Sequence, residues 1–140
     1  MTLAELRTEL VTDPTGLGYA AAWGGSDQGL ADLLNLPRAA ITVWRGLLPA
    51  YQVIDLVAWT EWTALSAANK QLLQTLTGTD TVNTESANTR AAFSQMFAAG
   101  TATRTALLAF AQRTGSRAEQ LWGTGRIVTE SEVSGARGLA

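Results

Sequence analysis

The sequence predicts a mainly all-α protein, a single compact domain of short helices over residues 1–140 with one or two short extended segments. Three observations lead to this prediction. The pattern Ser/Thr-x-x-Glu, which caps helix N-termini, occurs three times. Between the turn signals, apolar residues recur every three or four positions, as they do on one face of a helix. A chain of 140 residues with 46% apolar residues suits one domain that fills one hydrophobic core.

The first helix is expected over residues 3–11. Thr2 and Glu5 form a capping box at its start, and three leucines follow with the spacing of one helical stripe. The segment Asp13–Tyr19 reads D-P-T-G-L-G-Y, which combines a turn-forming aspartate, a proline and two glycines. We therefore expect the helix to end in a tight, shaped loop.

A second helix is expected to begin at Ser26 or Asp27 and to end before Pro37, with three leucines on one side. Residues 40–45 are β-branched and roughly alternating, which favours a short strand or an extended connector. A single strand cannot pair alone. We expect this segment either to pair with the β-like residues 126–128 or to be irregular.

The middle of the chain predicts two helices and a loop. Pro49 suits the first turn of a helix that reaches the region of Trp59. After a serine cap, leucines over residues 67–77 mark the buried face of the next helix, and Gly78 is a natural end for it. Residues 79–84 read T-D-T-V-N-T, which indicates a polar loop.

The remaining helices are predicted from their caps. Ser86 or Asn88 begins a helix that Gly100 ends, and Thr101 or Thr103 begins the next, so the two are expected to form a helical hairpin. Capping boxes at residues 116–119 and 129–132 then predict two short C-terminal helices.

Composition excludes most reactive chemistry. The chain has no Cys and no His, which removes disulfides, thiolate nucleophiles, the usual zinc sites and an imidazole base. We expect no enzyme activity, no catalytic residue, no cofactor and no metal. The nearest carboxylates in sequence, Asp27 with Asp32 and Glu130 with Glu132, have spacings that do not place both groups on one helical face, so solvated helix surface explains them better.

Charge and hydropathy limit the partners. Ten Lys and Arg residues against twelve Asp and Glu residues give a net charge of −2, which offers no excess of positive charge for nucleic acid. The start of the chain lacks the features of a secretory signal. Charged residues and a proline interrupt the most apolar stretch, residues 39–59, so we expect a soluble chain without a membrane span.

Tryptophan and arginine are the informative anomalies, with five Trp and nine Arg beside one Lys. Trp59 and Trp62 lie three positions apart and are expected to share a buried helical face. Trp23 and Trp44 lie beside chain breakers, where burial and contact with a neighbour are equally plausible. The arginines suit carboxylate pairing between subunits, and a coding bias explains their number equally well.

Four segments carry a resemblance to a known group of proteins. They read T-E-L-V-T-D-P-T-G-L-G-Y-A (residues 8–20), A-D-L-L-N (31–35), S-R-A-E-Q-L-W-G (116–123) and V-T-E-S-E-V (128–133). With this order, the chain resembles small proteins encoded among the virion genes of tailed bacteriophages. The resemblance implies a structural component of the phage particle, with no cofactor and no active residue to carry over.

The predicted function is that of a bacteriophage virion structural protein that acts by protein–protein contact, as a capsid decoration, neck or tail component. Its partners would be other phage structural proteins and further copies of itself, and its location the virion, assembled in the host cytoplasm. The loop 13–19 and the segment 38–46 are the expected contact surfaces, with five candidate interface residues: Tyr19, Trp23, Arg38, Trp44 and Arg45.

Two other functions remain as alternatives. Short helices joined by tight turns also suit a phage-encoded helix-turn-helix regulator that binds DNA, although no helix here carries more than two arginines. A small hydrolase that uses carboxylates alone is the third possibility.

Overall fold

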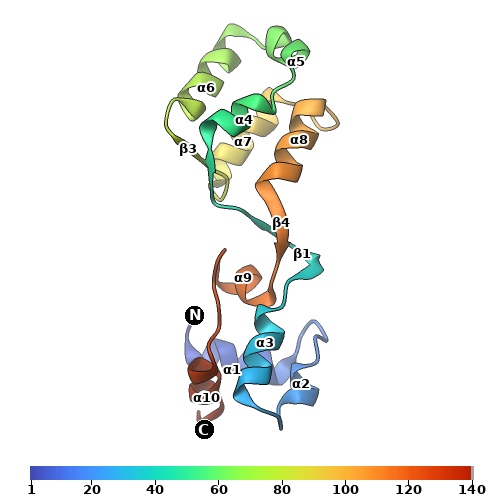
Figure 1. Ribbon diagram of the computed structural model, residues 1–140, viewed down its shortest axis with the longest axis vertical. Helices are drawn as coiled ribbons and strands as arrows, with labels where there is room; N and C mark the ends of the chain where they lie inside the picture. The colour runs from blue at the N-terminus through green and yellow to red at the C-terminus, as the bar shows by residue number, and fades with distance from the viewer. Residues whose placement is uncertain (140) are drawn as a thin grey trace. The chain divides into compact units, whose positions relative to one another are not determined.

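The computed structural model describes residues 1–139 and is mainly helical, with two small antiparallel sheets (Figure 1). The helical prediction is confirmed, but the protein is not strictly all-α. Instead of one core, the chain has two compact units. Unit 1 comprises Met1–Val43 and the chain from Thr114 onward, and unit 2 comprises Trp44–Arg113.

Unit 1 is built from helices that pack around one apolar cluster. Its helices are α1 (Leu3–Thr12), α2 (Tyr19–Ala22), α3 (Asp27–Asn35), α9 (Arg117–Trp122) and α10 (Glu130–Arg137). Helix α10 packs against both α1 and α3, and α3 also contacts α2 and α9. The cluster consists of Leu6, Leu10, Tyr19, Leu30, Ala31, Leu34, Ala118, Val128, Val133 and Ala136. Leu6, Leu10, Leu30 and Leu34 of the predicted helical stripes therefore face a common core, whereas Leu3 is exposed.

Unit 2 contains five helices and one small sheet. Its elements are β2 (Leu47–Pro49), α4 (Ala50–Asp55), α5 (Trp59–Ala64), α6 (Ala67–Thr77), β3 (Thr81–Asn83), α7 (Ala87–Met96) and α8 (Ala102–Ala111). Two apolar clusters stabilise it. One comprises Leu48, Ala50, Val53, Val82 and Ala111, and the other Leu73, Met96 and Phe97.

Seven helices begin at a Ser or Thr whose side-chain oxygen accepts a hydrogen bond from the backbone of the first turn. These N-caps are Thr2, Ser26, Ser66, Ser86, Thr101, Ser116 and Thr129. The capping boxes at Thr2, Ser116 and Thr129 are complete, with the glutamate side chain accepting from the backbone of the cap. The predicted helix starts are confirmed because a cap is decided by residues within one turn.

The predicted loop at residues 79–84 is wrong. Its central residues form β3, which pairs antiparallel with β2, and Val82 lies opposite Leu48 in the register. The Val82 side chain is buried while its two strand neighbours are exposed. One buried residue in a polar segment is enough for an edge of this short sheet, because the partner strand supplies the other apolar side chain.

The extended segment at residues 40–45 forms a strand, but not with the predicted partner. Strand β1 (Arg38–Trp44) pairs with β4 (Gln112–Gly115), and residues 126–128 are irregular. The pairing of residues 40–45 with residues 126–128 is therefore wrong. The sequence of β4, Q-R-T-G, has no alternation of apolar residues, so periodicity alone does not predict it.

The helix predicted from Pro49 to Trp59 is two helices. Helix α4 ends at Asp55 and α5 begins at Trp59, with the turn between them held by the α8 region. The Ala58 N–H donates a hydrogen bond of 2.9 Å to the hydroxyl of Thr103, and Thr103 is fully buried. The Glu61 carboxylate accepts from the N–H groups of Ala102 (2.8 Å) and Thr103 (3.1 Å), so a side chain of α5 caps α8. The hydrogen bonds from Thr103 lower the pKa of Glu61.

No helix between residues 1 and 139 has the length and apolar character that a membrane-spanning helix needs.

Candidate functional site

The loop that follows α1 in unit 1 is built around the carboxylate of Asp13. The Asp13 carboxylate accepts hydrogen bonds from the backbone N–H groups of Leu17 (2.7 Å) and Gly18 (2.8 Å). Asp13 itself ends α1 in the left-handed conformation, with a φ of 39°. Burial disfavours the carboxylate, but the hydrogen bonds of the loop outweigh it and hold the pKa of Asp13 below its ordinary value.

The Asp13 loop is expected to lose stability in acid. A carboxylate with a lowered pKa stabilises the folded state above its unfolded pKa of about 3.9, and this contribution disappears as the pH falls through the folded pKa. In Asp13→Asn, one side-chain acceptor remains and the left-handed backbone is tolerated, but the charge is gone. We expect the variant to be less stable than the parent at pH 7. The difference in free energy of unfolding between the two is expected to shrink as the pH falls below about 3.9, the ordinary pKa of an aspartate.

Urea denaturation at several pH values measures this difference. Asp55→Asn is the matched control, because Asp55 is exposed on α4 and its carboxylate accepts no hydrogen bond from a backbone N–H of residues 1–139. A pH-independent difference between the parent chain and Asp13→Asn would contradict the role of the charged carboxylate.

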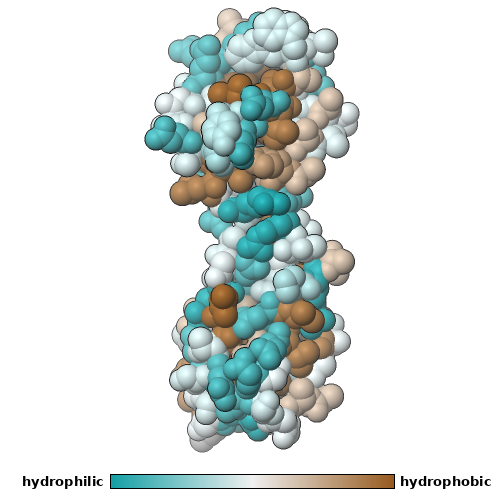
Figure 2. Space-filling model, in the orientation of Figure 1, coloured by the Kyte–Doolittle hydropathy of each residue, from teal (hydrophilic) through white to brown (hydrophobic). Residues whose placement is uncertain are grey.

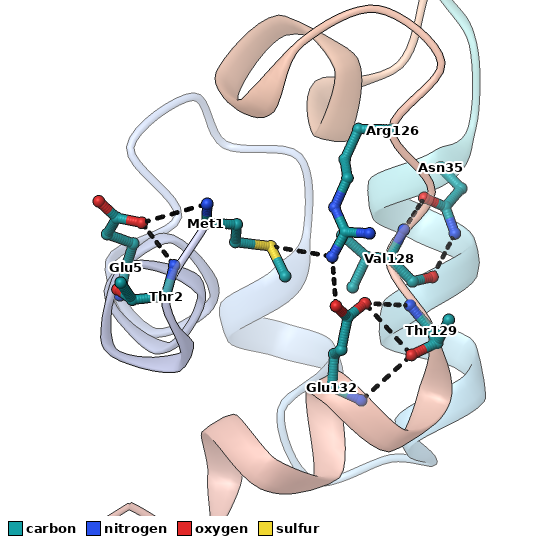
Figure 3. A network of polar contacts seen from close by, with 8 residues as sticks. All are labelled: Met1, Thr2, Glu5, Asn35, Arg126, Val128, Thr129 and Glu132. Atoms are coloured by element: carbon teal, nitrogen blue, oxygen red, sulfur yellow. Dashed lines mark hydrogen bonds and ion pairs between the residues drawn. The ribbon is translucent and has the colours of Figure 1, made fainter.

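Two contacts join the four resemblance segments in pairs. Glu9, in the first segment, accepts two hydrogen bonds from the guanidinium of Arg117, from Nε to Oε1 (2.6 Å) and from Nη2 to Oε2 (3.1 Å). The hydrogen bonds from Arg117 to Glu9 raise the pKa of the guanidinium. The side-chain amide of Asn35 accepts from the N–H of Val128 (2.9 Å) and donates to its carbonyl (2.7 Å), as Figure 3 shows. The resemblance segments therefore contribute to the framework of unit 1.

The fourth segment continues this network at the start of α10. Thr129 and Glu132 form the capping box, and Glu132 also pairs with the guanidinium of Arg126 (Figure 3). Burial disfavours the Glu132 carboxylate, but the bonds from Thr129 and Arg126 outweigh it and lower its pKa. The sulfur of Met1 lies 3.9 Å from the same guanidinium. The Glu132 carboxylate is therefore used for a helix cap and an ion pair within unit 1.

Tyr19, a candidate interface residue, lies in the core of unit 1. Its side chain is fully buried, and burial raises its pKa to about 12. Tyr19 therefore presents no side-chain surface to a partner in this fold. Its hydroxyl has no hydrogen-bond partner among the described residues.

Replacing Tyr19 with phenylalanine is expected to raise the free energy of unfolding by roughly 1 kcal/mol, because a buried hydroxyl without a partner destabilises the folded state. Thermal unfolding followed by circular dichroism measures the change. Tyr51→Phe, at an exposed tyrosine of α4, is the control and is expected to change stability little. A clear loss of stability in Tyr19→Phe would show that the hydroxyl is satisfied.

The other candidate interface residues are partly or fully exposed. Trp23 is half-buried against the unit 1 cluster, and the guanidinium of Arg137 lies 5.4 Å from its ring centre. Arg38 is half-buried and donates to the carbonyl of Leu33 (3.3 Å). Trp44 is half-buried and Arg45 is exposed. For these four residues an interface role stays a prediction.

Several arginines that were candidates for pairing between subunits instead pair inside unit 1. Arg117, Arg126 and Arg137 bind Glu9, Glu132 and Asp27, respectively. Asp27 is therefore part of an ion pair as well as of the first turn of α3. Over residues 1–139, no group of three or more Asp or Glu side chains is arranged to hold a metal ion.

Unit 2 contains a cavity of about 340 Å³ beneath α7 and α8. Its volume lies at the lower end of the range of small-molecule sites, roughly 300–1,000 Å³. The wall is mostly apolar, with a few hydroxyls and two arginines. It is formed by Trp44, Leu48, Val53, Val82, Thr84, Thr89, Arg90, Phe93, Ser94, Arg104, Leu107, Leu108, Ala111 and Gln112.

Both cavity arginines are held by backbone carbonyls. Arg90 donates through Nη1 to the carbonyls of Thr84 (3.0 Å) and Glu85, and its guanidinium lies 4.8 Å from the centre of the Trp44 ring. Arg104 donates through Nη1 to the carbonyls of Ser94 (3.4 Å) and Phe97 (3.3 Å). Among the described residues, the cavity is thus lined by two positioned cations and by no carboxylate.

A second feature of unit 2 is an exposed apolar surface over α4 and α5, formed by Tyr51, Ile54 and Trp59. The exposed fraction of the side chain is 74% for Trp59 and 64% for Tyr51. Ile54 and Trp59 also line a groove of about 250 Å³ together with Val57, Trp62, Leu73, Gln74 and Thr77. Figure 2 shows hydrophobic residues at the surface of unit 2. The predicted burial of Trp59 is wrong, whereas Trp62 packs against the Leu73 cluster.

Sequence reasoning missed the cavity arginines and the apolar surface. A signal existed for the arginines, because Arg90 and Arg104 each precede a large apolar residue of the same helix, Phe93 and Leu107, by three positions. Such spacing places a cation on the edge of a buried face. No comparable signal separates Trp59 from Trp62, since both fit the same stripe.

Comparisons with known proteins identify no relative of the chain. No family model matches the chain, and no curated protein or solved structure is significantly similar to it.

Proposed function

We propose that this chain is a structural protein of a tailed-bacteriophage virion that is present in several copies and acts by protein–protein contact. The observation that carries the proposal is the exposed apolar surface of Tyr51, Ile54 and Trp59 on unit 2. Aromatic side chains are enriched among the residues that dominate binding energy at protein interfaces. Exposed together on two adjacent helices, they are suited to cover the same kind of surface on a neighbouring subunit.

The resemblance supports the phage assignment, and the structure of unit 1 is compatible with it. The motif residues of unit 1 form a loop, an ion pair and helix caps, all of which stabilise the fold of that unit. The contacts of unit 2 would then supply adhesion to further copies. Repetition of one modest contact around a symmetric ring or lattice gives a stable assembly.

The direct test is to purify particles of the phage that encodes the chain and to image them. The proposal predicts that the chain is present in the mature particle in a symmetric ring or lattice. Absence of the chain from mature particles would refute the proposal. Retention of the purified chain on DNA, falling steeply with salt, would favour the alternative of a DNA-binding regulator.

A solution test addresses the surface itself. Size-exclusion chromatography with light scattering is expected to show association that rises with protein concentration, and Trp59→Ser is expected to reduce it by tenfold or more, about the effect of losing one interface anchor. Ile127→Ser is the matched control, because Ile127 is 65% exposed but lies in unit 1. Equal association of Trp59→Ser and the parent chain would show that this surface is not the contact.

A further inference from the structure

We propose that the cavity of unit 2 is a binding site for a small amphipathic carboxylate, an apolar chain or ring that carries one anionic head. The inference goes beyond the virion role and does not depend on it. It rests on the juxtaposition of an apolar cavity with Arg90 and Arg104, two guanidiniums that pair with no carboxylate of residues 1–139.

The apolar lining of the cavity indicates that most of the ligand is apolar. Leu48, Val53, Val82, Phe93 and Leu107 line the cavity and also belong to or pack against one hydrophobic cluster. A volume of about 340 Å³ accepts a short aliphatic or aromatic group. Transfer of such a group from water to this wall is favourable in proportion to the apolar area that it buries.

The positive charges of the two cavity arginines indicate that one end of the ligand is anionic. Each cavity arginine uses Nη1 for backbone carbonyls, and no contact of the described chain engages Nε or Nη2. The carbonyls fix the position of each guanidinium without neutralising it. An arginine fork presents parallel N–H donors that match the two oxygens of a carboxylate.

Three arginines of unit 1 show the acidic pairing that the cavity arginines do not make with residues 1–139. There, Arg117, Arg126 and Arg137 each pair with an acidic side chain. The chain has more acidic than basic residues, so a shortage of acidic side chains does not explain the difference. Two half-buried arginines on one apolar cavity therefore leave positive charge that an external anion would neutralise.

Arg90, which lies beside Trp44, forms one edge of the site. Its guanidinium lies over the indole ring, where the negative face of the ring favours the cation. The stacked plane is held in one orientation while its other edge remains available for hydrogen bonds. The hydroxyls of Thr89 and Ser94 lie on the same wall and can donate to a second oxygen of the ligand.

The experiment is a nuclear magnetic resonance titration of the full chain with three probes of equal length: octanoate, 1-octanol and octylammonium. Octanoate is expected to give saturable shifts of the Trp44 indole N–H and of the amides around Phe93 and Leu107, with unit 1 unchanged. The affinity for 1-octanol is expected to be lower by roughly tenfold or more, the usual loss when a hydrogen bond to a charged group is removed. Octylammonium is expected to bind more weakly still.

Substitutions of a cavity arginine then test where the carboxylate of octanoate binds. Arg104→Gln is expected to weaken octanoate binding by roughly tenfold or more, while Arg104→Lys, which keeps the charge, loses less. Arg45→Gln is the control, because Arg45 is an exposed arginine of unit 2 outside the cavity. If Arg104→Gln fails to fold, the three-probe series on the unchanged chain still decides the matter.

Each result counts for or against the site. Preference for octanoate at the cavity residues supports it. Absence of saturable shifts, shifts confined to other residues, or equal affinity for octanoate and 1-octanol would overturn it. Presence of the chain in the virion is measured separately, so that a failure of either proposal is recognised on its own.

Discussion

Replacing Glu9 with glutamine is expected to lower the free energy of unfolding by roughly 3–5 kcal/mol, the effect of removing one partner of a buried ion pair. The exposed fractions of the Glu9 and Arg117 side chains are 8% and 11%, so water cannot replace the lost carboxylate. The variant keeps one acceptor oxygen at position 9 but removes the negative charge, so the Arg117 charge is left among the helices of unit 1 facing only neutral amide oxygens, of residue 9 and of Gln120 at 2.7 Å. The measurement is urea denaturation followed by tryptophan fluorescence.

The double variant Glu9→Met/Arg117→Met separates two explanations for such a loss. If the damage comes from an unpaired buried charge, removing both charges is expected to restore much of the stability. If the damage comes from lost packing, the double variant is expected to be no better than Glu9→Gln. Glu130→Gln, at an exposed glutamate of α10, is the surface control and is expected to change stability by less than about 1 kcal/mol. A loss below about 1 kcal/mol in Glu9→Gln itself would contradict the prediction.

This ion pair also illustrates what sequence alone could not provide. The S-R-A-E pattern predicts the cap of α9, and that cap is observed, because Ser116 and Glu119 lie within one turn. The partner of Arg117 is 108 residues away in sequence, and no local pattern indicates it. Local hydrogen bonding therefore explains the correct helix starts, and long-range pairing explains most errors.

The strands follow the same rule. A β-strand is stable only with a partner, so its recognition depends on a distant segment as much as on its own residues. The alternating residues of β1 indicate a strand by themselves, whereas β3 and β4 are polar and become strands through pairing with β2 and β1. The division of the chain into two compact units is not indicated by the sequence for a related reason. Apolar content indicates that a core exists, but not how the chain divides it.

Of the candidate interface residues that the sequence indicates, one, Trp44, lines the cavity of unit 2. Trp44 was expected at an interface because it lies beside chain breakers, and in the structure it lines the cavity of unit 2 and stacks with Arg90. The four segments on which the resemblance rests belong to unit 1, while the cavity and the exposed Trp59 belong to unit 2. Helix caps and leucine spacing describe how both units fold, but they do not indicate the cavity or the exposed surface of unit 2.

The second large effect is expected at Gly115, a buried residue of β4 where an added methyl group has no space. A Cβ atom on Gly115 would lie 2.5 Å from Cγ1 and 2.8 Å from Cγ2 of Val43, on the paired strand β1. Its backbone does not have the positive φ that restricts side chains, so any effect of Gly115→Ala comes from this overlap. We expect the variant to lose roughly 1–3 kcal/mol of unfolding free energy.

Val43→Ala provides the decisive comparison, because it removes both methyl groups that the new Cβ would strike. In that background, Gly115→Ala is expected to destabilise less than in the parent chain, with a coupling energy of about 0.5–3 kcal/mol in a double-mutant cycle. Gly24→Ala is the matched control. Gly24 has no atom within 4 Å of the position of an added Cβ and no positive φ, so alanine there is expected to be neutral or to stabilise by about 0.4–1 kcal/mol. Additive losses at Gly115 and Val43 would show that β1 and β4 do not pack as closely as the structure places them, because two side chains in contact cannot be changed independently.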